Sequence, residues 1–308
     1  MMELLFNRDG NGAKELRMLT GGYSAANRFE NIESDVVSAT RDLVTVIGNR
    51  IYAKAVRAYQ EGDGNELVRL AQRPVAMLAC ARYFRRTDLT HEDGGRKVRQ
   101  ASDGTDRLPW EWQTDRDERA YLDEYYRDTE RLLEWLNEQK PEEWTGSEQY
   151  ARRKSLLIQS GAEFDLYYPI DGSERMFVLL SGFIREAQTA IIRPAYGTGF
   201  DSLANGAEDA LEDARFAACK ALALLSMAKA FRRMPLQLIP VGVVRSYTPS
   251  NGMQAAEPAT LKDVQVLART LEMDAMDWVR RMKEYRDREQ GESELLPKNG
   301  RENKFIRL

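Results

Sequence analysis

The sequence predicts a mainly α protein made of two tandem related helical-bundle domains, each with a small β-hairpin or arm. Three observations carry this prediction: a repeated pattern of residues, apolar side chains at helical spacing, and a length of 308 residues. A chain of this length sits near the size at which one core stops growing, so two domains of about 150 residues each are expected. Residues 1–150 then form the first domain, residues 151–290 the second, and residues 291–308 a C-terminal tail.

The repeat concerns the tripeptide Phe-Arg-Arg, which closes an apolar-periodic segment at residues 84–86 and another at residues 231–233. Each copy is followed, at the same distance, by a glycine, Gly95 in the first half and Gly242 in the second. The same order of helices and turns surrounds both copies. Self-similarity of this kind decides architecture, and here it indicates a divergent tandem duplication.

Helical spacing of apolar residues predicts three main helices in the first half. Ser34 is expected to cap a helix that covers residues 34–51. A second helix is expected over residues 65–86, where Pro74 removes one backbone hydrogen bond and is expected to kink or split it. The third is a long helix over residues 111–139 with an apolar stripe and charged residues on its other faces.

The second half repeats this plan. Helices are expected over residues 173–192, with Pro194 past the end, and over residues 205–233, the most apolar segment of the chain. Thr260 is expected to cap the final helix, which has an inward apolar stripe of its own.

Short β elements are expected between these helices. Residues 4–18 are expected to form a short strand, a turn over residues 9–12, and then a second short strand or the start of a helix. Residues 156–168 are expected to form two short strands around Gly161, and residues 87–109 a polar exposed hairpin or arm. The counterpart of that arm in the second half, residues 236–247, is β-rich and much more apolar.

The residue types that carry chemistry are sparse. The single histidine, His91, lies in the polar arm, so a histidine-based metal site or a catalytic triad lacks its parts. Cys80 and Cys219 lie in apolar helical runs typical of small buried thiols. The carboxylates of residues 115–130 alternate with arginines as on the solvent face of a helix. No catalytic, metal or cofactor-binding residues are therefore expected, and no cofactor.

Composition and net charge narrow the possible functional classes of the protein further. The net charge of −4 and pI of about 5.5 differ from the strongly basic balance of a dedicated duplex-DNA binder. No stretch reaches the roughly 20 apolar residues of a membrane span. The first residues do not resemble a signal peptide, so the protein is expected to be made in the cytoplasm.

The layout carries a family resemblance. Each half has a helix, an Ala-rich helix that ends in an aromatic residue and arginines, a glycine-marked exposed β segment, and a long charged helix. This order resembles the small head-tail connector proteins of tailed bacteriophages. The doubled arrangement is most similar to an uncharacterised family encoded in phages and prophages of Bacteroides-type bacteria. Gly95-Arg96 and Gly242-Val243 are the sharpest points of the resemblance.

The resemblance implies a structural virion protein of the phage neck and no enzyme. It implies an adaptor ring, a homo-oligomer of twelve copies by analogy, that docks on the portal protein and extends the DNA channel. Tail or stopper proteins would bind next, double-stranded DNA would pass transiently through the channel, and no membrane is involved. A helical protein-protein adaptor or regulator of the cytoplasm, outside any virion, is the alternative, and an enzyme with an unconventional carboxylate site ranks third.

An assembled ring needs exposed segments that reach neighbouring copies. Trp110 and Trp112, at the foot of the polar arm, are candidate anchors because Trp and Arg dominate interface hot spots. An equally open interpretation is that they staple the arm onto the long helix. The full set of interface candidates is Arg96, Lys97, Arg99, Trp110, Trp112, Lys304, Phe305, Ile306 and Leu308.

Overall fold

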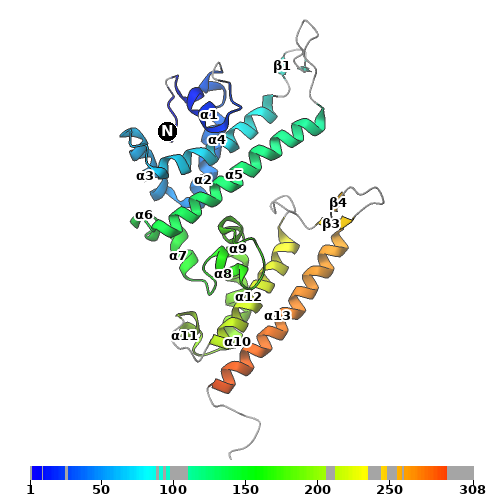
Figure 1. The fold of residues 1–308 in the computed structure, drawn as a ribbon. Helices are drawn as coiled ribbons and strands as arrows, with labels where there is room; N and C mark the ends of the chain where they lie inside the picture. Colours follow the sequence, from blue (N-terminus) through cyan, green and yellow to red (C-terminus); the bar gives the residue numbers. More distant parts are fainter. Residues whose placement is uncertain are drawn as a thin grey trace, which may run out of the picture. The chain divides into compact units, whose positions relative to one another are not determined.

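The chain is mainly helical in a computed structural model (Figure 1). The structure describes residues 2–8, 10–24, 27–87, 90–92, 95–97, 110–205, 212–234, 244–247, 255–258 and 260–289. Two compact units divide the chain, Met1–Arg152 and Arg153–Leu308. We call them the first and the second unit.

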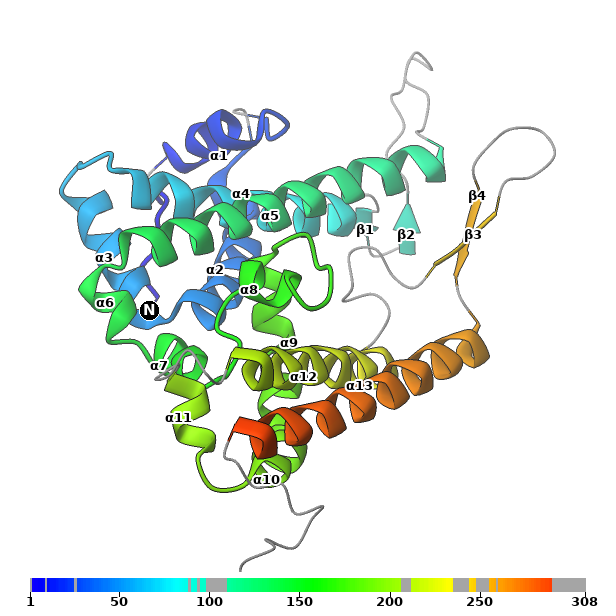
Figure 2. The ribbon, with the colours of Figure 1, turned by 60° about the horizontal axis from the view of Figure 1, so that its bottom comes forward.

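In the first unit, the central element is α4, which packs against α5 along one side and against α2, α1 and α3 on others (Figures 1 and 2). Its middle is buried almost completely, from Pro74 to Ala81. The elements are α1 Gly12–Thr20, the 3₁₀ turn η1 Phe29–Asn31, α2 Glu33–Ile47, α3 Asn49–Gln60, α4 Glu66–Thr87, β1 Thr90–Glu92, β2 Gly95–Lys97, α5 Glu111–Gln139, α6 Glu142–Thr145 and α7 Glu148–Lys154, whose last two residues fall in the second unit.

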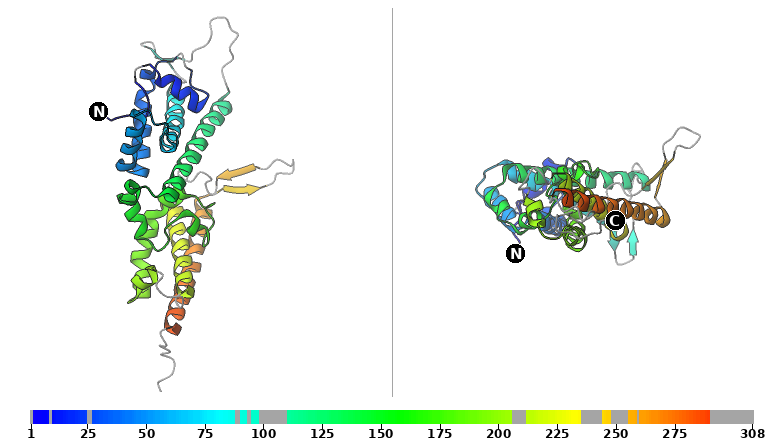
Figure 3. Two further views of the ribbon diagram at one scale, coloured as in Figure 1. Left: turned by 60° about the vertical axis from the view of Figure 1, so that its left-hand side comes forward. Right: turned by 90° about the horizontal axis from the view of Figure 1, so that it is seen from below.

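In the second unit, α12 holds the same central place, between α13 and α9 (Figure 3). Of the 22 residues of α12, 13 are buried, and most of these are alanine or leucine. The elements are α8 Gly161–Asp165, α9 Glu174–Ala187, the π-helical turn η2 Gln188–Ile192, α10 Arg193–Tyr196, α11 Phe200–Asn205, α12 Glu212–Arg233, β3 Val244–Tyr247, β4 Ala255–Pro258 and α13 Leu261–Glu289.

The described parts of the two units follow one order of elements. A helix of 22 residues that ends in Phe-Arg-Arg or just after it, α4 or α12, is followed by an antiparallel pair of short strands and then by a helix of 29 residues, α5 or α13. We call the strand pairs β1–β2 and β3–β4 the first and second arm. Phe84 and Phe231 occupy corresponding places in the last turns of α4 and α12.

The strands expected at residues 4–6 and 156–168 are wrong, whereas the helix start expected as one alternative after the first turn is confirmed by α1. Residues 4–6 and 156–158 are buried, but the described chain continues from them into the helices α1 and α8. Side chains satisfy the backbone of the buried triplets: Gln72 Nε2 donates to the Leu5 carbonyl at 2.6 Å, and the Leu157 N–H donates to Gln188 Oε1 at 2.7 Å. A buried backbone needs partners, and here side chains replace a second strand.

The expected helix over residues 34–51 is two helices. Gly48 adopts a φ of 84°, which ends α2 and lets α3 begin in a new direction. Ser34 is not the cap of α2, because the helix begins at Glu33 and Ile32 holds the N-cap position. The predicted helix over residues 111–139 is confirmed at both ends.

Two prolines bear on the expected helices. Of the two outcomes expected for Pro74, a kink or a split, the split is wrong, since α4 runs from Glu66 to Thr87 with the buried proline inside it. Pro194 does not lie past the end of a helix: α9 passes through η2 into α10, and Pro194 sits in the first turn of α10. Proline has no N–H to donate, and the wider π-helical turn η2 lies directly before α10 in the helical path.

Several helix starts and faces are confirmed. Ser173 caps α9 by accepting from the Met176 N–H, and Thr260 Oγ1 accepts from the Asp263 N–H at the start of α13. The predicted inward face of α13 is buried or half-buried against the core; it comprises Val264, Leu267, Leu271, Trp278, Val279, Met282 and Tyr285.

Candidate functional site

The interface candidates of the first arm lie at two places. Arg96 and Lys97 are on β2, where they pair in register with His91 and Thr90 of β1. Trp110 is the N-cap residue of α5, and its indole is 71% exposed. The staple interpretation is therefore wrong for Trp110, which leaves a large aromatic side chain in solvent at the foot of the arm.

The other candidates fall largely outside the description. Trp112 lies in the first turn of α5, but its side chain is not among the described ones. The predicted candidates Arg99, Lys304, Phe305, Ile306 and Leu308 all lie outside the described residues.

Ion pairs fasten the end of α4 to its neighbours in the first unit. Arg85 pairs with Glu118 of α5 at 3.1 Å, and Arg86 pairs with Asp35 of α2 at 2.8 Å. One turn earlier, Arg82 pairs with Asp42, also on α2. The two arginines of the Phe-Arg-Arg motif thus point to different neighbouring helices.

The end of α12 is fastened in the same pattern. Arg232 pairs with Glu272 of α13 at 2.7 Å, and Arg233 pairs with Glu186 of α9 at 2.6 Å. One turn earlier, Lys229 pairs with Glu186 at 2.8 Å. Hydrogen bonds from Lys229 and Arg233 lower the pKa of Glu186. The repeated tripeptide therefore has the same role in both units.

A cleft opens at the root of each arm, where the Phe-Arg-Arg end of one helix meets the start of the long helix. In the first unit it has a volume of about 510 Å³ and an acidic lining: Ala81, Phe84, Arg85, Gln113, Thr114, Asp115, Asp117 and Glu118. In the second unit it has a volume of about 460 Å³ and an apolar and basic lining: Phe231, Arg232, Leu261, Val264, Gln265 and Arg269. The two clefts share a place in the fold but differ in charge.

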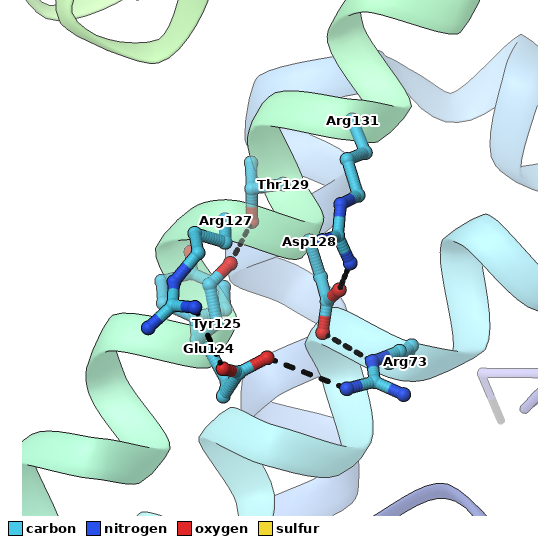
Figure 4. A network of polar contacts seen from close by, with 7 residues as sticks. All are labelled: Arg73, Glu124, Tyr125, Arg127, Asp128, Thr129 and Arg131. Atoms are coloured by element: carbon cyan, nitrogen blue, oxygen red, sulfur yellow. Dashed lines mark hydrogen bonds and ion pairs between the residues drawn. The ribbon is translucent and has the colours of Figure 1, made fainter.

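A buried carboxylate joins α4 to α5 farther along the first unit. Asp128 is only 3% exposed and pairs with Arg73 at 2.8 Å and with Arg131 at 3.1 Å (Figure 4). Arg73 also reaches Glu124 at 3.3 Å, and Arg127 pairs with that same glutamate. The expectation that the carboxylates of this helix all face solvent is wrong for Asp128, which forms a cross-helix tie.

Chemistry-bearing groups in the described part of the chain are otherwise buried or paired. Cys80 and Cys219 are free and fully buried, and burial raises the pKa of both thiols to about 12. The described residues hold no group of three or more His, Cys, Asp or Glu side chains arranged to bind a metal ion. None of the described helices has the length and apolar content to cross a membrane.

Two features escaped sequence reasoning. Asp128 looks like any other charged residue of α5, and its burial depends on Arg73, which is distant in the sequence. Leu261 directly follows Thr260, the cap of α13, and is 74% exposed. The cleft that Leu261 lines is formed where the end of α12 meets the start of α13. An apolar residue directly after the helix cap is the only sign of this cleft in the local sequence.

Comparison with known proteins found no match among curated proteins or solved structures. A family model does match, in one segment of each half: residues 34–154 and residues 199–292, more than two thirds of the chain. The chain therefore belongs to the Family of unknown function (DUF6712).

Proposed function

We propose that this protein is a structural component of the neck of a tailed bacteriophage, an adaptor ring that docks on the portal and extends the DNA channel toward the tail. In this proposal, the protein acts in the virion after synthesis in the host cytoplasm. Its partners are other copies of itself, the portal protein, and tail or stopper proteins. It has no catalytic role.

The observation that carries the proposal is the doubled plan of a 22-residue helix, a short strand pair and a 29-residue helix. We further propose that the two units arose by duplication of one helical-bundle domain with a β arm. The equivalent ion pairs at the ends of α4 and α12 support this relation, because both Phe-Arg-Arg motifs use their arginines in the same way. This order of elements resembles the layout of head-tail connector proteins, and the proposal rests on that resemblance.

The exposed surface also supports a role in assembly. Trp110 is 71% exposed at the foot of the first arm, and Trp is enriched at interface hot spots. The mild net charge of −4 suits a channel through which DNA passes, since few phosphate contacts mean weak retention.

The test is assembly with a portal protein from the same phage or prophage genome. Purified protein alone, purified portal alone and their mixture are compared by mass photometry, and the mixture is imaged by negative-stain electron microscopy. We expect a ring stacked on the portal ring, with twelve copies of this chain. A chain that stays monomeric in the mixture contradicts the proposal and favours a helical adaptor or regulator outside the virion.

A further inference from the structure

The clefts at the roots of the two arms have the same place in the fold and opposite chemistry. The apolar lining residues of the cleft in the second unit are Phe231, Leu261 and Val264. Its charged lining residues, Arg232 and Arg269, are both basic. Arg232 is already paired with Glu272, whereas no ion pair of Arg269 occurs among the described side chains. This groove therefore fits a convex surface that carries an apolar anchor and an acidic group.

The start of α5 in the first unit has that chemistry. Trp110 is 71% exposed, and Asp115 and Asp117 are exposed one and two turns farther along the helix. Within the described part of the chain, neither aspartate forms an ion pair. An indole supplies a large apolar anchor at low entropic cost, and a neighbouring carboxylate adds charge complementarity.

The spacing along the two helices also agrees. Trp110 and Asp117 are seven residues apart, which corresponds to about 10.5 Å along a helix axis. Leu261 and Arg269 are eight residues apart, about 12 Å. Laid side by side and parallel, the first three turns of α5 and α13 bring the indole toward the apolar lining of the cleft and the carboxylate toward the guanidinium.

We propose that the start of α5 in one copy of this chain docks on the start of α13 in a second copy. Trp110 enters the groove of Phe231, Leu261 and Val264, and Asp117 pairs with Arg269. The two surfaces differ, so the contact is heterologous: each copy offers one surface of each kind, and both are occupied once the ring closes. This inference rests on the proposed ring assembly and names its subunit interface.

Charge reversal tests the contact on the full-length protein. Asp117→Arg and Arg269→Asp each place like charges together, and we expect each to weaken self-association at least tenfold in sedimentation velocity. The double variant restores the pair and is expected to recover most of the association. Trp110→Ala is expected to weaken it at least tenfold as well. Asp123→Arg is the matched control, because Asp123 is exposed on the same helix but about 240° around the axis from Asp117.

A cysteine cross-link separates this inference from the proposed function. The chain with Asp117→Cys and Arg269→Cys is expected to form intermolecular disulfides under mild oxidation, and the two native thiols are buried and do not compete. If the protein forms a ring, alone or on the portal, and neither reversal nor cross-linking acts on it, the interface is wrong and the neck role stands. If the protein stays monomeric with and without portal, both are wrong.

Discussion

Arg73 of α4 donates to Asp128 of α5 across 2.8 Å, and the aspartate is only 3% exposed. Arg131 supplies a second guanidinium to that carboxylate from within α5. A buried carboxylate costs free energy unless its lone pairs are satisfied, so the tie depends on both arginines. It joins the two main helices of the first unit, α4 and α5.

Replacement of Arg73 by Met is therefore expected to lower the free energy of unfolding by about 1–3 kcal/mol, because Asp128 loses one of two charged partners. The measurement is urea unfolding followed by circular dichroism. The control is Arg127→Met, which removes an exposed pair with Glu124 and is expected to cost less than about 1 kcal/mol. Equal losses in the two variants would show that Asp128 does not need Arg73.

A second prediction concerns the glycine that starts α1. A Cβ at Gly12 would lie 2.3 Å from the Asn7 carbonyl oxygen and 2.5 Å from the Phe29 ring, so either the buried loop or the ring must move. Gly12→Ala is expected to destabilise the protein by about 1–3 kcal/mol in the same unfolding assay. Gly64→Ala is the matched control, since a Cβ there meets nothing within 4 Å, and we expect no loss. A neutral Gly12→Ala variant would contradict the packing of α1 on this loop.

The third prediction concerns pH and the cluster at the end of α12. Hydrogen bonds from Lys229 and Arg233 lower the pKa of Glu186 below its ordinary value of 4.5. A lowered pKa in the folded state stabilises the fold above pH 4.5, and this contribution is lost as the pH falls through the folded value. Glu186→Gln should therefore be less stable than the natural protein at pH 7, and the difference should shrink toward pH 3. A difference that is constant with pH would mean that the charge of Glu186 does not stabilise the cluster.

The fourth prediction uses the thiols as reporters of the two units. Cys80 and Cys219 are buried, and burial raises the pKa of each to about 12. Thiolate is the reactive form, so the native protein is expected to leave both thiols unlabelled by an alkylating reagent at pH 8. Mass spectrometry in rising urea will show at which concentration each thiol, one per unit, becomes labelled. Rapid labelling of either thiol in the native protein would contradict the described core.

The long helices illustrate what could be predicted. The range of α5 follows from its apolar stripe and the proline after it, and the inward face of α13 follows from spacing at three and four residues. Such signals are local, because 3.6 residues per turn place the apolar side chains on one face. The secondary-structure prediction failed where an apolar run is too short to show a helical or strand periodicity. The buried segments at residues 4–6 and 156–158 resemble strands, and only tertiary side-chain partners decided otherwise.

The candidate site also has a part that the sequence predicted and a part that only the structure shows. Trp110 was found from its residue type and its place beside the arm, and the structure adds that its indole is exposed. The clefts could not be predicted, because each is formed by the end of one helix and the start of another, separated by an arm. The two clefts differ in charge because the packing of the helices determines which side chains line each cleft.

The sequence by itself determined the helical character, the extent of the longest helices, the buried cysteines and the repeated Phe-Arg-Arg motif, since each depends on residues close together in the chain. Tertiary structure alone decided what the motif does: in both units its two arginines reach acidic residues on different helices. It also decided that Asp128 is buried while similar neighbours are not. The physical reason is that ion pairing and desolvation depend on distances between segments far apart in sequence, which local patterns do not encode.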